Sequence, residues 1–301
     1  MRNKIWFLVC TILVLVGAGC RQKTEAPVSP EPASPATIDI AVSIYPLAHF
    51  AKKVGGDKVN VHLITPGGVE PHEYEPTPSD IIKIQSSKAF VFNGAGVDVW
   101  AGALEEDLKK KGITVLEMTD YLDDHSPIDP HIWLDPVLAQ EQIEIFVQLL
   151  VALDPGNRTV YEKNGALSIA ELLQLDQDYK NTLSQCSLKD IVVSHDAFGY
   201  VGTRYGITIH PIAGLSPEEE PSAARLAELS RLMKEKNIKI VFFETLVTPK
   251  LAQTLAKEVG AEVFVLNPIE GISDKENKAG ENYDTLMREN LNNLKIALVC
   301  R

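Results

Sequence analysis

From residue 38 onward, short runs of β-branched and apolar residues alternate with stretches in which hydrophobic residues recur at helical spacing. In the first half the strand-like runs are 38–44, 59–65, 89–93 and 114–118. The same pattern restarts in the second half at 191–194, 207–212, 238–243 and 262–266. Alternating strands and helices are typical of an α/β fold, in which helices cover both faces of a parallel sheet. The pattern therefore predicts two Rossmann-like lobes with four-stranded parallel sheets, 38–153 and 188–301.

One long helix is expected to join the lobes over residues 154–187. Asp154-Pro155 opens a stretch of helical character that continues to Cys186 without an internal proline. Its one weak position is Gly165, where glycine costs about 1 kcal/mol relative to alanine, so a bend is expected there. A helix is also predicted to start at Thr77, because Thr-Pro-Ser-Asp offers an N-cap, an early proline and an acidic third residue.

The first 37 residues are interpreted as a targeting segment and a tether. Residues 1–19 combine two basic residues, an apolar run too short to span a bilayer comfortably and a small-residue end, as a signal peptide does. The sequence Gly-Ala-Gly-Cys at 17–20 resembles a bacterial lipobox, which makes Cys20 the expected lipidation site and anchor on the outer side of a membrane. Gly17 stands where leucine is usual, so a cleaved signal without lipid and an uncleaved anchor stay open. Residues 20–37 are rich in Pro, Ala and Ser and predict a flexible tether.

Charge limits the possible partners of the protein, and the cysteine content limits its possible disulfides. The net charge of -12 and the lack of basic runs argue against nucleic acid as a partner, because phosphate binding needs clustered Lys and Arg. With Cys10 and Cys20 in the targeting region, Cys186 and Cys300 remain as a pair. They form either a disulfide or two separate buried thiols, and neither has the spacing of a metal site.

Four polar segments follow predicted strands, and each contains one strong metal donor. In doubly wound sheets ligands bind beyond the carboxyl ends of the strands, where such segments converge. Neutral imidazoles and a carboxylate suit tetrahedral Zn²⁺. The four donors come in equal numbers from the two halves of the chain, which places the ion between the lobes. These candidate ligands are His72, His131, His195 and Glu270.

The other histidines outside these segments carry a simpler interpretation. His49 lies inside a predicted helix, and His62 and His210 lie in predicted strands, so a structural role is expected for each. His125 belongs to the acidic stretch 120–129, which either recruits a cation before transfer or is a solvated loop.

The segments PHEYEPTPSD, DPHIWLDP, SHDAFGY and NPIEG, in this order, resemble the zinc/manganese class of ABC-transporter solute-binding proteins, the cluster A-I or ZnuA/TroA-like group. The resemblance implies two lobes joined by a long helix, metal held at their interface by His72, His131, His195 and Glu270, and transfer to a cognate ABC permease. We expect a monomer. Manganese-binding relatives tend to carry a carboxylate where His195 stands, so the resemblance favours Zn²⁺ over Mn²⁺.

Some ligand details and functions stay open at this point. Water or Glu244 is an alternative to Glu270 as fourth donor. Glu75, Asp135 and Asp196 either orient the imidazoles or are exposed loop charges. A zinc hydrolase is the main alternative function, although the sequence lacks an HExxH motif and a fourth protein ligand would close the site. A surface adhesin is the other alternative.

Overall fold

The structure, a computed structural model, describes residues 37–122 and 129–301. The predicted signal peptide, Cys20, all of the tether except Thr37, and His125 lie outside the described residues, so these predictions remain predictions.

The first four strands form the predicted parallel sheet of the N-terminal lobe. They are β1 (Ile38–Val42), β2 (Val59–Leu63), β3 (Ala89–Phe92) and β4 (Thr114–Glu117), in the spatial order β2-β1-β3-β4. Ile38 pairs with Val59 and Val42 with Leu63, so β1 and β2 end level with each other. The chain segments that leave these two strands therefore begin at the same edge of the sheet.

The second sheet repeats this topology in the C-terminal lobe. Its strands are β5 (Asp190–Val193), β6 (Thr208–Pro211), β7 (Ile240–Phe243) and β8 (Glu262–Val265), in the order β6-β5-β7-β8. All neighbouring strands are parallel. The predicted α/β fold with two four-stranded parallel sheets is confirmed.

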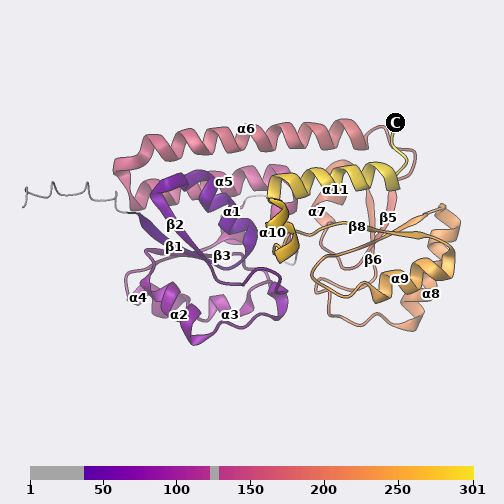
Figure 1. The fold of residues 1–301 in the computed structure, drawn as a ribbon, viewed down its shortest axis with the longest axis horizontal. Helices are drawn as coiled ribbons and strands as arrows, with labels where there is room; N and C mark the ends of the chain where they lie inside the picture. The colour runs from indigo at the N-terminus through magenta and orange to yellow at the C-terminus, as the bar shows by residue number, and fades with distance from the viewer. Residues whose placement is uncertain (1–36, 123–128) are drawn as a thin grey trace, which may run out of the picture. The chain divides into compact units, whose positions relative to one another are not determined.

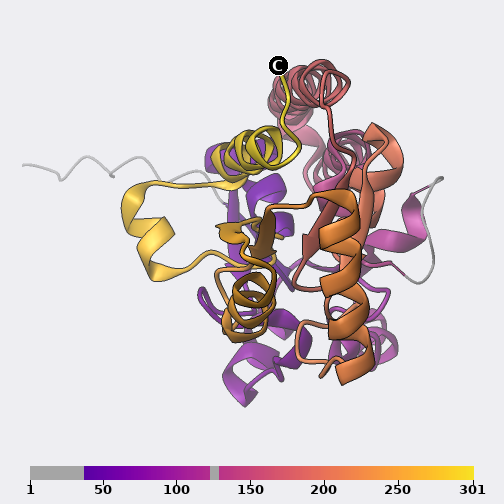
Figure 2. The same ribbon diagram turned by 90° about the vertical axis from the view of Figure 1, so that its right-hand side faces the viewer.

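Helices cover both faces of each sheet (Figure 1). The N-terminal lobe contains α1 (Tyr45–Gly55), α2 (Pro78–Ser86), α3 (Val99–Gly102), α4 (Glu105–Lys110) and α5 (Pro136–Leu153). The C-terminal lobe contains α7 (Gly199–Tyr205), α8 (Ala223–Lys236), α9 (Lys250–Val259), α10 (Asp274–Ala279) and α11 (Tyr283–Ala297), of which α10 projects from the side of the fold (Figure 2). The helix starting after Thr77 has the predicted capping box, with Thr77 and Asp80 as reciprocal partners.

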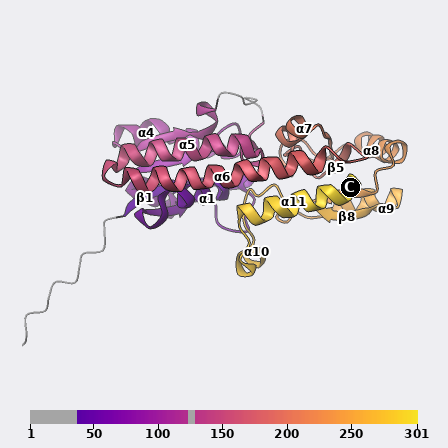
Figure 3. The ribbon, with the colours of Figure 1, turned by 90° about the horizontal axis from the view of Figure 1, so that it is seen from above.

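The long connecting helix is α6 (Arg158–Leu183), preceded by a short 3₁₀ turn at Pro155–Asn157. It lies between α5 and α11 when the fold is seen from above (Figure 3), and it packs against helices of both lobes. The helix continues through Gly165 without interruption. A Cβ there would lie 2.3 Å from the Val147 side chain, so glycine is needed for the close approach of α5 and α6.

By length and composition, α5 is the one helix in the described residues apolar enough to cross a membrane. More than half of it (56%) is buried within the fold, against α6 and α1. It therefore has the placement of a core helix.

One hydrophobic core continues from the N-terminal lobe through α6 into the C-terminal lobe. It includes Val42 and Phe50 of the first lobe, Leu172 of α6, and Val193 and Leu286 of the second. Each sheet has one smaller core on its other face, around Phe90 in the N-terminal lobe and around Leu229 in the C-terminal lobe. Residues 36–301 accordingly form one compact unit in which the largest core belongs to both lobes.

The two cysteines left open by the sequence form a disulfide, Cys186–Cys300. Cys186 follows α6 and Cys300 follows α11, so the bond joins the ends of these two helices. The C-terminus, next to Cys300, lies at the end of α6 and α11 in the C-terminal lobe (Figure 1).

Candidate metal centre

The four predicted ligands converge. One donor atom each from His72, His131, His195 and Glu270 lies within 4.8 Å of every other. Each is carried by the segment expected from the sequence, two from each lobe. The side chains of His131, His195 and Glu270 are fully buried, and that of His72 is 7% exposed.

The spacing of the donors fits a tetrahedral metal. His131 Nε2 and His195 Nε2 each lie 3.2 Å from Glu270 Oε1 and 3.2 Å from each other, and His72 Nε2 lies 3.6 Å from the same oxygen. Tetrahedral ligands about 2.0–2.1 Å from Zn²⁺ are separated by about 3.3–3.4 Å. His72 Nε2 and both Glu270 oxygens are buried without a hydrogen-bond partner among the described residues. Such atoms are costly unless a cation satisfies them, so the donor set fits a metal ion.

The His72 segment, residues 66–76, follows β2 and has few fixed contacts. His72 lies in a 3₁₀ turn, Pro71–Glu73, and its backbone N–H donates to Glu70 Oε1 at 3.3 Å. Tyr74 anchors the far end of the segment, because its hydroxyl donates to Asp80 Oδ2 at 2.7 Å. A surface pocket of about 680 Å³ lies directly against this segment.

The His131 segment, residues 129–136, is held at many points. Asp129 Oδ1 accepts from the backbone N–H of His131 at 3.0 Å and lies 2.9 Å from its Nδ1. Asn93 of the same lobe donates to the Pro130 carbonyl at 2.9 Å, and Tyr200 of α7 donates to the Asp129 carbonyl at 3.1 Å. With Nδ1 bonded to Asp129, the Nε2 atom of His131 is directed to the metal position.

His195 is oriented in the same way by Glu244. Its Nδ1 lies 2.6 Å from Glu244 Oε1, and both side chains are buried. The sequence suggested Glu244 as a substitute ligand, but the structure places it behind His195, outside the ligand cluster. Glu244 therefore fixes the ring and strengthens its basicity.

The three orienting carboxylates suggested by the sequence do not contact a ligand ring. Asp135 caps α5 by accepting from Val137 N and is paired with Arg204 of α7. Glu75 is exposed, and Asp196 contacts Gly214 through its backbone. The suggestion is wrong for Asp135, whose side chain bonds Val137 and Arg204, and Glu75 is an exposed loop charge, the alternative role. Asp129 and Glu244 are the carboxylates that bond the ligand rings. Of these two, only Asp129 could have been found from the sequence, because it lies two residues before His131.

Glu270 is presented by a tightly bonded loop after β8. Ile269 has φ +57°, a left-handed conformation that costs a β-branched residue about 1–3 kcal/mol. The loop is held in it by Asn267, whose side-chain oxygen accepts from Ile269 N at 2.8 Å. Asn290 of α11 in turn bonds both the N–H and the carbonyl of Asn267. The strain is therefore supported by the surrounding structure and turns Glu270 inward.

The electrostatics of the metal-free cluster are those of a cation site. Burial alone would raise the pKa of Glu270, but His131 and His195 outweigh it and hold this pKa well below its usual range. Burial alone would lower the pKa values of both imidazoles, but nearby carboxylates raise them, Asp129 and Glu270 for His131 and Glu244 and Glu270 for His195. The surrounding carboxylates thus favour positive charge among these side chains.

Sequence reasoning missed Glu70, a half-buried carboxyl group that interacts with Glu270. Burial, followed by repulsion from Glu270, raises the pKa of Glu70 to about 9. Its Oε2 is buried without a hydrogen-bond partner in the described structure. Burial and the neighbouring Glu270 therefore favour the neutral form of Glu70.

The remaining described histidines have the structural roles expected of them. His62 bonds Asp39 and His210 bonds Asp190, both at 2.9 Å, next to the strands that carry them. His49 of α1 lies 3.3 Å from Asp284 of α11. None belongs to the ligand cluster.

Comparison with known proteins identifies the family. The family described as "Zinc-uptake complex component A periplasmic" matches residues 40–297, which cover nearly all of the described chain. The chain belongs to this family. The resemblance drawn from the four sequence motifs is confirmed.

Individual relatives in the zinc-uptake component A family are similar over most of the chain. The high-affinity zinc uptake system protein ZnuA of Bacillus subtilis is 38% identical over 284 residues, 88% of each chain. The zinc-binding lipoprotein AdcA of Streptococcus pneumoniae is 36% identical over 97% of this chain, which spans only 60% of AdcA. The crystal structure of the Zn(II)-bound ZnuA-like domain of the same AdcA matches with a TM-score of 0.78 and 39% identity, covering 87% of this chain and 99% of that one.

Proposed function

We propose that this chain captures Zn²⁺ outside the cytoplasmic membrane and delivers it to the permease of an ABC importer. The observation that carries this proposal is the buried cluster of three imidazoles and one carboxylate between the lobes. The Zn(II)-bound AdcA domain and the B. subtilis zinc uptake protein support it, since both are similar over most of this chain. Zinc is the cargo, and the site holds it until transfer.

The donor set favours zinc over manganese. Nitrogen donors from three histidines suit a borderline-soft ion in tetrahedral geometry, whereas Mn²⁺ prefers oxygen donors and a higher coordination number. Glu270 supplies the one oxygen, and its burial with both oxygens unpartnered supports it as the fourth ligand in place of water or Glu244.

The arrangement supports binding more than hydrolysis. A catalytic zinc keeps one coordination position open for water, but four converging protein donors occupy all four positions of a tetrahedral site. We expect no turnover, and a screen with ester, amide and phosphoester substrates tests this. Binding to extracellular-matrix proteins, the adhesin alternative, is compatible with transport and is tested separately by a pull-down.

The location and assembly follow from the proposed role. We propose that lipid on Cys20 holds the protein at the outer side of the membrane, with residues 20–37 as the tether and a monomer as the working form. Extracytoplasmic placement agrees with the periplasmic description of the family and the lipoprotein description of AdcA. Metabolic labelling with a fatty acid, lost in Cys20→Ala, tests the anchor.

The deciding experiment is metal analysis of the full chain purified without added metal, followed by competition between Zn²⁺ and Mn²⁺. We expect about one zinc per chain and displacement of manganese by zinc. His131→Ala should lose the bound metal, and His210→Ala is the matched control because that histidine bonds Asp190 away from the cluster. Retention of metal by His131→Ala, or preference for manganese, would contradict the proposal.

A further inference from the structure

Trp133 links the two segments that carry His131 and Glu270. It follows His131 by two residues, and its indole Nε1–H donates to the carbonyl of Pro268 at 2.7 Å. Pro268 precedes Glu270 by two residues in the other lobe. The Trp133 side chain is fully buried, so water does not compete for this hydrogen bond.

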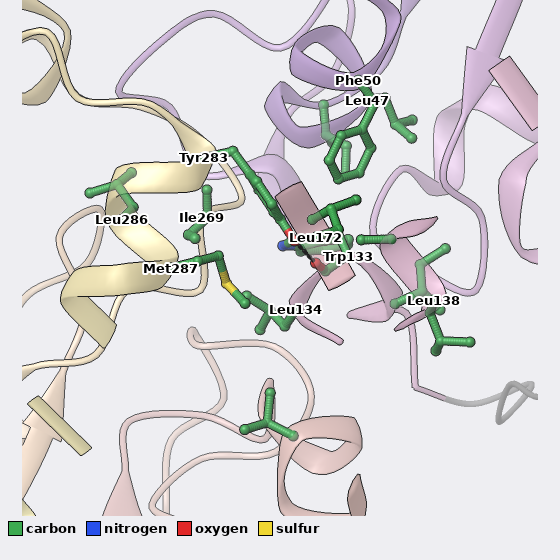
Figure 4. Close-up of a cluster of buried hydrophobic side chains, with 14 of the residues drawn as sticks. Leu47, Phe50, Trp133, Leu134, Leu138, Leu172, Ile269, Tyr283, Leu286 and Met287 are labelled. Carbon is green, nitrogen blue, oxygen red and sulfur yellow. Dashed lines mark hydrogen bonds between the residues drawn. The ribbon is translucent and has the colours of Figure 1, made fainter. Parts of the chain in front are cut away.

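Trp133 is itself fixed from the C-terminal lobe. The hydroxyl of Tyr283, the first residue of α11, donates to the Trp133 carbonyl at 2.5 Å. Figure 4 shows Tyr283 and Trp133 directed toward each other, with Ile269 beside them. The tryptophan is therefore held at its backbone by one element and at its ring by the loop before Glu270.

The loop before Glu270 needs such support. Ile269 holds a left-handed backbone conformation, and the Glu270 oxygens accept no hydrogen bond of good geometry from any described residue. The direction of the carboxylate is thus set by the backbone of its loop. Asn267 and Asn290 brace this loop within its own lobe, and Trp133 is the brace that comes from the lobe of His131.

We propose that Trp133 is a positioning residue that aims Glu270 at the metal through Pro268 and thereby slows metal release. The inference rests on the zinc capture proposed above. It adds that Glu270, a ligand from the C-terminal lobe, is held in place by Trp133, which belongs to the His131 segment of the N-terminal lobe. A preset fourth donor keeps the ion bound longer, because no loop rearrangement is needed to maintain coordination.

The experiment measures zinc release from the full chain, mixed with excess chelator, in Trp133→Phe. The variant keeps an aromatic ring but removes the N–H donor. We expect release to be faster by about 10-fold or more, the usual effect of losing a group that orients a metal ligand. The association rate should stay within about twofold, since the three imidazoles are unchanged.

A double-mutant cycle separates positioning from general destabilisation. If Trp133 acts through Glu270, adding Trp133→Phe to Glu270→Ala should produce little further acceleration of zinc release. If the two changes multiply, Trp133 does not act through Glu270 and the inference is wrong.

Tyr179→Phe is the matched control. Its hydroxyl also donates to a backbone carbonyl at 2.7 Å in a buried place, but the acceptor is Met287 on α11. Tyr179→Phe should lower the melting temperature of the metal-free protein without changing zinc release. Equal acceleration in Tyr179→Phe and Trp133→Phe would overturn the proposal.

If Trp133→Phe does not fold, Tyr283→Phe tests the same link, because it frees the Trp133 carbonyl and keeps the indole. An acceleration of about threefold is then expected. Unchanged release in a folded variant overturns the inference while leaving zinc capture intact. Failure of the unaltered chain to bind zinc would instead remove the proposed function.

Discussion

The His72 and His131 segments each bring one imidazole from the N-terminal lobe, but the C-terminal lobe holds them in different ways. Tyr200, Arg204 and Tyr283 of that lobe all bond the His131 segment. Within the described residues, the His72 segment meets the same lobe through no hydrogen bond beyond the contact of His72 with Glu270 at 3.6 Å. One segment is fixed by bonds from the C-terminal lobe, and the other is held mainly by its own turn.

This difference suggests an order of events. His131, His195 and Glu270 are fully buried and held by their neighbours, so we expect His72 to be the ligand that moves when an ion enters or leaves. His72 lies beside the surface pocket. Release is then expected to begin with loss of the His72 contact.

Removing one imidazole from each segment gives the largest expected contrast. His131→Ala should weaken zinc binding by more than about 100-fold, beyond the loss typical of an orienting group, because it empties a fixed position. His72→Ala should cost less, since three preset donors remain and water takes the fourth place, as in open zinc sites. Competition against a chelator of known affinity measures the zinc affinity of both variants. Equal losses of affinity would contradict the difference between the two segments.

Neutralising the carboxylates behind the fixed ligands should have the next largest effect. Asp129→Asn and Glu244→Gln each remove the charged partner of a ligand ring, so zinc affinity should fall by about 10–100-fold. Glu75→Gln is the control in the His72 segment, where the carboxylate is exposed, and should change affinity by less than about twofold. A comparable loss in the control would show that net charge matters more than orientation.

Amide hydrogen exchange offers a direct view of the two segments. Zinc should slow exchange in residues 66–76 by about 10-fold or more, because coordination of His72 closes a segment that opens locally in the metal-free protein. Residues 129–136 should change little, since hydrogen bonds to both lobes hold this segment. Strong zinc-dependent protection of the His131 segment would show that it is not prearranged.

The smallest effect is expected on stability at acidic pH, from the carboxylate of Asp284, the residue after Tyr283. Burial alone would raise the pKa of Asp284, but His49 and Lys53 outweigh it and lower this pKa to about 2. Because the folded value lies below the unfolded value of about 3.9, the stabilisation is present above about pH 4 and is lost as pH falls toward 2.

Asp284→Asn tests this contribution. At neutral pH the variant should unfold about 1 kcal/mol more easily than the unaltered chain, a value reduced for partial solvent screening. The difference in the free energy of unfolding, measured with urea, should shrink between pH 4 and 2. A difference that does not depend on pH would assign the effect to packing and would contradict a contribution from the charge of Asp284.

The fold and the convergence of the four candidate ligands were largely predictable because they depend on local patterns. Strand and helix periodicity, the Thr77 cap and donors placed after strands are all readable along the chain. The partners of the ligands were harder to predict because they come from distant segments. Glu244 lies 49 residues after His195, and Trp133 lies 135 residues before Pro268. Asp135 was misassigned because its use by Arg204 depends on how the lobes meet.

The hydrophobic core that runs from Phe50 through Leu172 to Leu286 crosses the boundary between the lobes. A chain cut near residue 187 would give two fragments, each with half of a core exposed as an apolar face. We therefore expect neither fragment to fold alone, although each contains a complete sheet. The two sheets are alike in topology, yet they share one core and should fold together.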